Sequence, residues 1–309
     1  MKTFANQNKL MPIDQNDTID PPVMHGGGGG IEIASPSILD GIFVKPVGYA
    51  IEGTDAGDTL RGSDLADDIF GGHGNDTLYG QRGNDRLYGG NDNDTLIGGQ
   101  GADLLDGGAG SDTVSYWTSS EAVTIDLAHG TGFNGDAAGD TYVGIENAIG
   151  SNFADSITGS AGNNTLNGGG GDDQILGGIG QDRIIGGAGD DRLTGDTMGV
   201  FDSDTFVFRP TDGADFITDF QSGIDKIDVS AYGHSADTSP FGADGKLAKG
   251  WVEPDGDLSN VSGLDEGDRF FYDFVNNVLW ECTYEDGMLF LTDKIVTTSH
   301  NVYIQDLIV

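Results

Sequence analysis

A right-handed parallel β-roll, an all-β solenoid, is the fold class that three features of this 309-residue sequence predict. The first is a nine-residue period that runs without insertions from residue 71 to residue 115, beginning GGHGNDTLY and GQRGNDRLY. The second is a constant pattern within the nonamers: glycine is first, aspartate is sixth and an aliphatic residue is eighth. The third is the presence of 53 glycines with no collagen-like G-x-y period. A short fixed period sets a stacked architecture in which each repeat supports the next.

Each nonamer contains a turn followed by a strand-sized segment with one inward aliphatic side chain. Two nonamers close one coil, so residues two nonamers apart stack at about 4.8 Å, the spacing between strands. This spacing places Asp76 above Asp94, Asp94 above Asp112, and Asp85 above Asp103. The eighth positions predict a narrow core column made of Leu60, Ile69, Leu78, Leu87, Leu96, Leu105 and Val114, continued by Ile157, Leu166, Ile175, Ile184 and Leu193.

The organisation of the chain follows from where the period holds and where it fails. The first array opens with two nonamers, at Gly53 and Gly62, that lack the fourth-position glycine, and we expect these to be end coils. In the second array Asn164 replaces the sixth-position aspartate, so we expect a weaker site there. The predicted parts are a flexible, disordered leader (1–45), a first array (46–115), an interlude of strands and loop (116–149), a second array (150–207) and a C-terminal β cap (208–309).

The charge of the chain indicates why this stacking needs a cation. The formal net charge is −37, from 51 acidic and 14 basic residues, and adjacent carboxylates in a column repel one another. Ca²⁺ accepts about six to eight oxygen ligands, which carboxylates and the free carbonyls of glycine turns supply. We therefore expect several calcium ions, and folding that depends on them. The candidate ligands and turn residues are Asp58, Asp67, Gly71, Gly72, Gly74, Asp76, Gly80, Gly83, Asp85, Gly89, Asp94, Gly98, Gly101, Asp103, Gly107, Gly110, Asp112, Asp155, Gly168, Gly171, Asp173, Gly177, Gly180, Asp182, Gly186, Gly189, Asp191 and Asp204.

Some acidic residues outside the regular nonamers are ambiguous. In the interlude, Asp136, Asp140 and Glu146 either hold another ion or belong to a solvated loop, and we favour the loop. After the second array, Asp202 and Asp204 lie in a longer turn and are candidates to close the last site.

The nonamers resemble the GGxGxDxUx repeat of RTX (hemolysin-type calcium-binding) proteins, a family secreted by Gram-negative bacteria. The resemblance implies a calcium-loaded β-roll with ions between stacked turns, held by sixth-position aspartates and turn carbonyls. The segment FVFRPTDGADFITDF and the residues after it resemble the cap of the roll in serralysin-type proteases. The terminal VYIQDLIV, with Asp306 before three aliphatic residues, resembles the signature of type I secretion substrates. These likenesses imply a secreted, extracellular protein with a type I exporter as partner.

The sequence also disfavours several classes of function. The acidic composition argues against nucleic acid as a partner, and no segment has the length of a transmembrane helix. No HExxH, GxSxG or P-loop motif occurs in a suitable context, so we expect a non-catalytic calcium-binding protein. The alternative is an accessory or carbohydrate-binding module of a polysaccharide-acting or other secreted enzyme, with a cell-surface or extracellular polysaccharide as partner. Trp117, Trp251 and Trp280 are far apart in sequence, so we expect core positions rather than a sugar platform.

Overall fold

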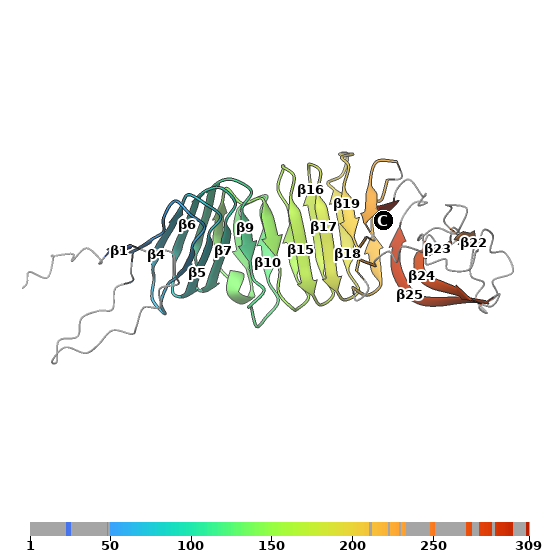
Figure 1. The fold of residues 1–309 in the computed structure, drawn as a ribbon, viewed down its shortest axis with the longest axis horizontal. Coiled ribbons are helices and arrows are strands. Elements are labelled where there is room, and N and C mark those ends of the chain that lie inside the picture. The colour runs from blue at the N-terminus through green and yellow to red at the C-terminus, as the bar shows by residue number, and fades with distance from the viewer. Residues whose placement is uncertain are drawn as a thin grey trace, which may run out of the picture.

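The protein is an elongated β-roll in which two sheets face each other along the long axis (Figure 1). The computed structural model describes residues 48, 50–209, 212–221, 223–228 and 230–232, with further strands at 23–25, 248–250, 270–273, 278–285, 288–298 and 307–308. The predicted all-β, parallel solenoid is confirmed. Apart from strand β1, the predicted leader lies outside the described residues up to position 45.

Two sheets contain all the strands of the described residues. The first is 16-stranded and comprises β1 (Val23–His25), β2 (Ala50–Glu52), β4 (Asp68–Gly72), β6 (Arg86–Asn91), β8 (Leu104–Ala109), β10 (Thr124–Asp126), β11 (Thr131–Phe133), β12 (Thr141–Val143), β14 (Ser156–Thr158), β16 (Gln174–Gly178), β18 (Arg192–Asp196), β20 (Asp215–Ile217), β22 (Ala248–Gly250), β23 (Phe270–Asp273), β24 (Val278–Glu285) and β25 (Met288–Thr298). The second is 10-stranded and comprises β3 (Thr59–Arg61), β5 (Thr77–Arg82), β7 (Thr95–Gln100), β9 (Thr113–Ser115), β13 (Asn147–Ile149), β15 (Thr165–Gly170), β17 (Arg183–Ala188), β19 (Thr205–Val207), β21 (Lys226–Asp228) and β26 (Leu307–Ile308). Two short 3-10 helices, η1 (Gly135–Ala137) and η2 (Ser230–Tyr232), complete the described elements. None of these helices is long and apolar enough to cross a membrane.

Consecutive nonamers alternate between the sheets, which sets the register predicted from the period. In the second sheet Leu60 pairs with Leu78 and Leu78 with Leu96, always in parallel strands. In the first sheet Ile69 pairs with Leu87 in the same manner. The core column is therefore a stack of aliphatic side chains from both sheets, and its members are almost completely buried. Each buried aliphatic side chain contributes about 1.5–3 kcal/mol to folding.

The interlude keeps both sheets continuous although it interrupts the nonamer period. In the second sheet β13 pairs in parallel with β9 on one side and β15 on the other. In the first sheet the chain inserts antiparallel β11 between β12 and β10, which pair in parallel with β8 and β14. The alternation of residues 122–127 predicts one buried face, and Val123, Ile125 and Leu127 are indeed buried.

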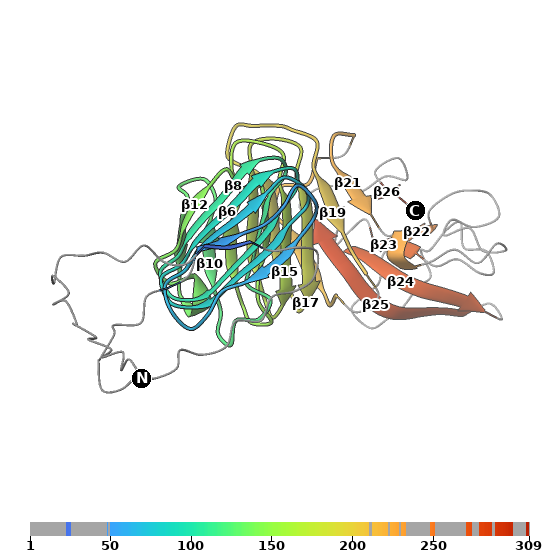
Figure 2. The same ribbon diagram turned by 60° about the vertical axis from the view of Figure 1, so that its left-hand side comes forward.

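The C-terminal strands extend the stack beyond the second array. Strand β25 pairs in parallel with β20, and β24 and β23 then add in antiparallel fashion. Strand β26 pairs with β21 at the end of the second sheet. In Figure 2 the β24–β25 hairpin projects from the last coils of the roll. The limits predicted for the leader, arrays, interlude and cap stay predictions.

Candidate metal centre

Two rows of turns run along the edges of the roll, one row where the chain passes from the first sheet to the second and one where it returns. The sixth-position aspartate ends each turn and directly precedes the next strand. Its backbone N–H donates to the carboxylate of the aspartate one coil later: Asp58 N lies 2.7 Å from Asp76 Oδ1, and Asp76 N lies 2.8 Å from Asp94 Oδ1. The same bond links Asp85 N to Asp103 Oδ1 at 2.8 Å. The predicted stacking of carboxylates is thus confirmed.

Both columns are present in the second array, although the second one is interrupted between Asp140 and Asp155, whose Oδ1 accepts the N–H of Val123. The first row runs through Asp58, Asp76, Asp94, Asp112, Glu146, Asn164, Asp182, Asp204 and Asp225. The second row runs through Asp67, Asp85, Asp103 and Asp140, and after the interlude through Asp155, Asp173, Asp191 and Asp215. Every aspartate and asparagine of both columns is buried.

Ten of these aspartates leave their second carboxylate oxygen, Oδ2, buried and without a hydrogen-bond partner in the described residues. They are Asp76, Asp85, Asp94, Asp103, Asp112, Asp173, Asp182, Asp191, Asp204 and Asp215. A buried charged oxygen without a partner is costly, so such atoms mark a missing ligand. We name the turns that end in these ten aspartates the open turns.

The first-position glycine forms the wall of a cradle around each free oxygen. A Cβ on Gly71 would lie 2.3 Å from Asp76 Oδ2 and 2.5 Å from the carbonyl oxygen of Gly89 in the next coil. Other first-position glycines face their own aspartates in the same way, namely Gly80, Gly89, Gly98, Gly107, Gly168, Gly177 and Gly186. Glycine therefore leaves room for an ion between a carboxylate and neighbouring carbonyl oxygens.

The other predicted glycines shape the turns. Gly72 and Gly74 adopt φ values of 109° and 96°, which only glycine adopts readily. A Cβ at the fourth positions would come within 3 Å of backbone in the preceding coil, as for Gly74, Gly83, Gly101, Gly110, Gly171, Gly180 and Gly189. These residues allow the turns to stack closely, which brings the carbonyls of adjacent coils together.

Oxygen-only donors around small cradles fit a hard cation such as Ca²⁺. No group of three or more acidic, histidine or cysteine side chains in the described residues converges on one point. The side chains alone therefore do not complete a coordination shell, and an ion here depends on turn carbonyls for most of its ligands.

A second kind of turn, which we name the closed turn, satisfies its own carboxylate. Ser63 donates both its N–H, at 2.6 Å, and its hydroxyl, at 2.9 Å, to Asp67 Oδ2. Thr54 does the same for Asp58. In each case a hydroxyl residue replaces the second-position glycine, and its hydrogen bonds occupy the oxygen that stays free in an open turn.

The second array also begins with closed turns. Ser151 donates its N–H to Asp155 Oδ2 and its hydroxyl to Oδ1, and Ser160 donates to Asn164 Oδ1. The amide of Asn164 donates in turn to the carbonyl of Glu146. Asp58, Asp67 and Asp155 were predicted as calcium ligands. In the structure the Oδ2 atoms of these three residues accept hydrogen bonds from Thr54, Ser63 and Ser151.

Burial in the open turns raises the pKa of the aspartates. Desolvation raises the pKa of Asp85 to about 7 and that of Asp103 to about 8, and the stacked like charges add to this effect. The backbone hydrogen bond from the preceding aspartate opposes the rise. Desolvation likewise raises the pKa of Asp173 and of Asp204 to about 8. Without a cation, ionised carboxylates at neutral pH therefore destabilise the roll.

Two expectations about the interlude are corrected by the structure. Asp140 is 2 % exposed, and its Oδ2 accepts a hydrogen bond of 2.6 Å from the Tyr116 hydroxyl, so it does not belong to a solvated loop. Trp117 was expected in the core but is 56 % exposed, because Tyr116 takes the interior position. The side chains of Trp251 and Trp280 lie outside the described part of the chain.

Sequence reasoning missed Asp215 and Asp225 as the last members of the columns. Longer turns place them away from the regular spacing, although each is followed two residues later by a buried isoleucine, Ile217 or Ile227. Asp202 was predicted to close the last site, and its Oδ2 accepts the N–H of Gly180 at 3.0 Å.

The nonapeptide geometry agrees with a known family of repeats. The family model of the RTX calcium-binding nonapeptide repeat matches in four copies, at residues 52–87, 79–114, 149–184 and 176–197. No curated protein matches the sequence, whereas 33 chains of solved structures match. One of these is the crystal structure of the extracellular lipase LipA from Serratia marcescens, with 16% identity and a TM-score of 0.30 over 86% of this chain. The present chain covers 40% of that lipase chain.

Proposed function

Because this chain is an RTX protein whose nonapeptide repeats bind Ca²⁺, we propose that its roll folds when it meets extracellular calcium and then serves as a secreted, non-catalytic scaffold. The observation that carries the proposal is the set of ten buried aspartate oxygens without hydrogen-bond partners in the described residues. Each is aimed at a turn where only an added ligand would compensate its burial.

The proposed coupling of calcium to folding follows from the charge balance. A chain with a net charge of −37 repels itself. In the compact state desolvation, and after it the like charges of the column, raise the pKa of the open-turn aspartates, so folding adds a burial cost to this repulsion. Divalent cations between coils convert the repulsion into attraction. Extracellular calcium modules bind at about 10⁻⁴–10⁻³ M, so the roll would stay unfolded where free calcium is scarce and fold where it is abundant.

Secretion through a type I exporter is part of the same proposal. It is supported by the likeness of the segment VYIQDLIV to the signature of such substrates. A chain kept unfolded by low calcium suits passage through a narrow exporter, and calcium outside the cell would then drive folding. Deleting the last eight residues and measuring secretion by cells that express a type I exporter tests this part, and secretion that persists after the deletion would refute it.

Circular dichroism in chelator and in calcium tests the folding proposal. We expect a spectrum of an unfolded chain in chelator and a β-sheet spectrum after addition of millimolar Ca²⁺. Magnesium at the same concentration is the control, and we expect little folding because Mg²⁺ demands a stricter octahedral geometry and retains its water. A β-sheet spectrum that persists after chelation would overturn the proposal.

The non-catalytic part of the proposal needs its own test. It is supported by the absence of the protease and lipase motifs noted above from the whole sequence. Calcium-saturated protein incubated with ester, peptide and polysaccharide substrates is expected to give no product above a heat-inactivated control. Reproducible turnover of any of them would refute this part and leave the calcium proposal intact.

A further inference from the structure

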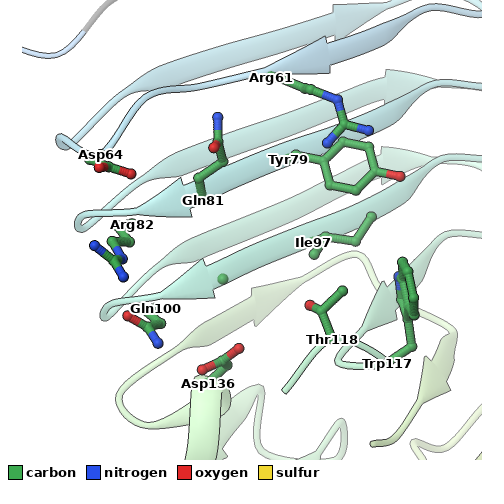
Figure 3. A pocket seen from close by; sticks show the side chains of 11 residues that line it. Arg61, Asp64, Tyr79, Gln81, Arg82, Ile97, Gln100, Trp117, Thr118 and Asp136 are labelled. Carbon is green, nitrogen blue, oxygen red and sulfur yellow. The ribbon is translucent and has the colours of Figure 1, made fainter. Parts of the chain in front are cut away.

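A groove of about 630 Å³ lies on the outer face of the second sheet, beside the interlude (Figure 3). Its floor is made by Tyr79 and Ile97, which occupy equivalent positions on neighbouring strands β5 and β7. Trp117 and Thr118 border it on the side of the interlude, as Figure 3 shows. The groove lies on the face of the sheet opposite the core column. Asp85 and Asp103 are absent from its lining, but Gln81 and Gln100 of their turns form one end of it, so the groove adjoins the calcium turns.

One feature of this groove, the exposure of Trp117, is unexplained by folding, whereas a second, the backbone of Gln81, has a partner in the fold. Trp117 is 56 % exposed, although a tryptophan gains most from burial. Gln81 has a φ of 81°, whereas glycines occupy the same turn position in Gly72, Gly90 and Gly99. A non-glycine residue in this region of φ carries backbone strain, and here the side chain has a use in the fold, because Gln81 Nε2 donates to the carbonyl of Gly62.

The groove carries no net charge in a strongly acidic chain. Arg61 and Arg82 line it together with Asp64 and Asp136, so two positive and two negative groups balance. The Arg61 guanidinium lies 3.8 Å from the centroid of the Tyr79 ring, which holds it over the floor. With 14 basic against 51 acidic residues in the whole chain, this local balance is unusual. A ligand with a large net charge gains nothing from such a lining, while an uncharged ligand rich in donors and acceptors fits it.

We propose that this groove binds a neutral oligosaccharide. The indole of Trp117 offers a flat apolar face for the C–H side of a sugar ring, as amphipathic aromatic residues do at binding surfaces. The side-chain amide of Gln100 supplies donors and an acceptor for hydroxyl groups, and the amide oxygen of Gln81, whose Nε2 already donates to the carbonyl of Gly62, adds an acceptor. The carboxylate of Asp136, which lies beside Gln100 in Figure 3, accepts from further hydroxyls. The open shape and the spread over three strands suit several sugar units of a chain rather than one enclosed monosaccharide.

Isothermal titration calorimetry in saturating calcium tests this proposal with defined probes. Cellohexaose, maltohexaose and mannohexaose represent neutral chains of different linkage, and a hexameric oligogalacturonate represents an acidic chain, each used up to about 10 mM. We expect at least one neutral hexamer to bind and the acidic hexamer to bind more weakly. Failure of all three neutral hexamers, or a preference for the acidic one, would overturn the proposal.

Matched variants locate the binding. Trp117→Ala should weaken binding by about tenfold, whereas Phe133→Ala, which removes an equally exposed ring outside the groove, should change it by less than about twofold. Gln100→Ala removes an exposed amide from the groove lining, so it should weaken binding without lowering the thermal midpoint. Gln174→Ala, which removes an equally exposed amide outside the groove lining, should leave binding unchanged. Equal losses in Trp117→Ala and Phe133→Ala would overturn the proposal.

The measurement separates this proposal from calcium-dependent folding, which it requires because β3, β5 and β7 belong to the first array. Protein that fails to show a β-sheet spectrum in calcium would refute the folding proposal. Protein that folds in calcium and binds no neutral hexamer would refute the groove proposal alone. Sedimentation of the wild type and of Trp117→Ala tests whether a second copy of the chain occupies the groove. A wild-type dimer that is lost in the variant would mean that it does.

Discussion

Replacing Asp85 with asparagine should separate the two roles of an open turn, because it is expected to stabilise the metal-free roll and to weaken the calcium response. Asp85 is 1 % exposed; its Oδ1 accepts the N–H of Asp67 at 2.7 Å, and its Oδ2 has no partner in the described residues. An asparagine retains the Oδ1 acceptor and removes the charge. The amide of Asn164 shows that an Nδ2 in such a position finds a carbonyl, in that case of Glu146.

The magnitude follows from the pKa of this carboxylate. Burial raises the pKa of Asp85 from an ordinary 3.8 to about 7. A group whose folded-state pKa is raised destabilises the folded state above its unfolded pKa, and at pH 7 this cost is on the order of 4 kcal/mol in full. The turns lie at the edge of the roll, where water screens part of the charge, so we expect Asp85→Asn to gain about 2–3 kcal/mol in chelator.

Two titrations measure both effects. Urea unfolding in chelator, followed by circular dichroism with a stabilising osmolyte present for both proteins, gives the free energy of the metal-free roll. A calcium titration at pH 7 gives the midpoint of folding, which Asp85→Asn should shift to higher calcium concentration and make less steep. Asp67→Asn is the matched control, because Ser63 already occupies Asp67 Oδ2, and its calcium midpoint should change much less. Lower stability in chelator, or equal calcium shifts in both variants, would refute the reasoning.

Three further predictions rest on the same geometry. Lowering the pH from 8 to 5 should increase the β-sheet signal of the metal-free protein and raise the calcium midpoint of folding. Burial raises the pKa of Asp94 to about 6 and that of Asp103 to about 8, so the folded roll holds protons more tightly than the unfolded chain. A metal-free β-sheet signal that falls over this pH range would contradict the prediction. Leu96→Ala, at a fully buried position, should cost about 2–5 kcal/mol in calcium-saturated urea unfolding, and a loss under about 1 kcal/mol would argue against a tight core column. Gly71→Ala should abolish one calcium site in equilibrium dialysis because its methyl group meets Asp76 Oδ2, whereas Gly162→Ala, whose Cβ would have no neighbour nearer than 3.9 Å, should retain the full stoichiometry.

The period of the sequence predicts the fold and the columns because a fixed number of residues per coil leaves one way to stack them. Leu78 and Leu96 pair as expected, and Asp76 and Asp94 stack as expected. This reasoning stops where the number of residues between column members changes. Asp103 continues to Asp140, and Asp191 to Asp215, across insertions whose length gives no sign of the register.

The difference between open and closed turns was visible in the sequence but needed coordinates for its meaning. Thr54 and Ser63 stand where regular nonamers have glycine, and the sequence alone predicts only that their nonamers are end coils. A hydroxyl in this position either points to solvent or turns inward to the carboxylate, and only the geometry decides between the two. The exposure of the Trp117 side chain could not be predicted from the sequence for a related reason. The strand ends at Ser115, so strand alternation does not predict which way the residues beyond it point.

The hydrogen bonds between successive aspartates of a column give the roll a direction, because each runs from a backbone N–H to a carboxylate farther along the chain. Removing a coil from the beginning of an array would leave a carboxylate without a donor, which water or a cation can replace. Removing a coil from the end would leave a buried N–H without its acceptor, which no cation can replace. The two ends of the stack are therefore chemically unequal. Asp140 and Asp225, which accept from Tyr116 and Gln221, close the acceptor end with groups from outside the nonamers, so a shortened roll should survive trimming at its start better than at its finish.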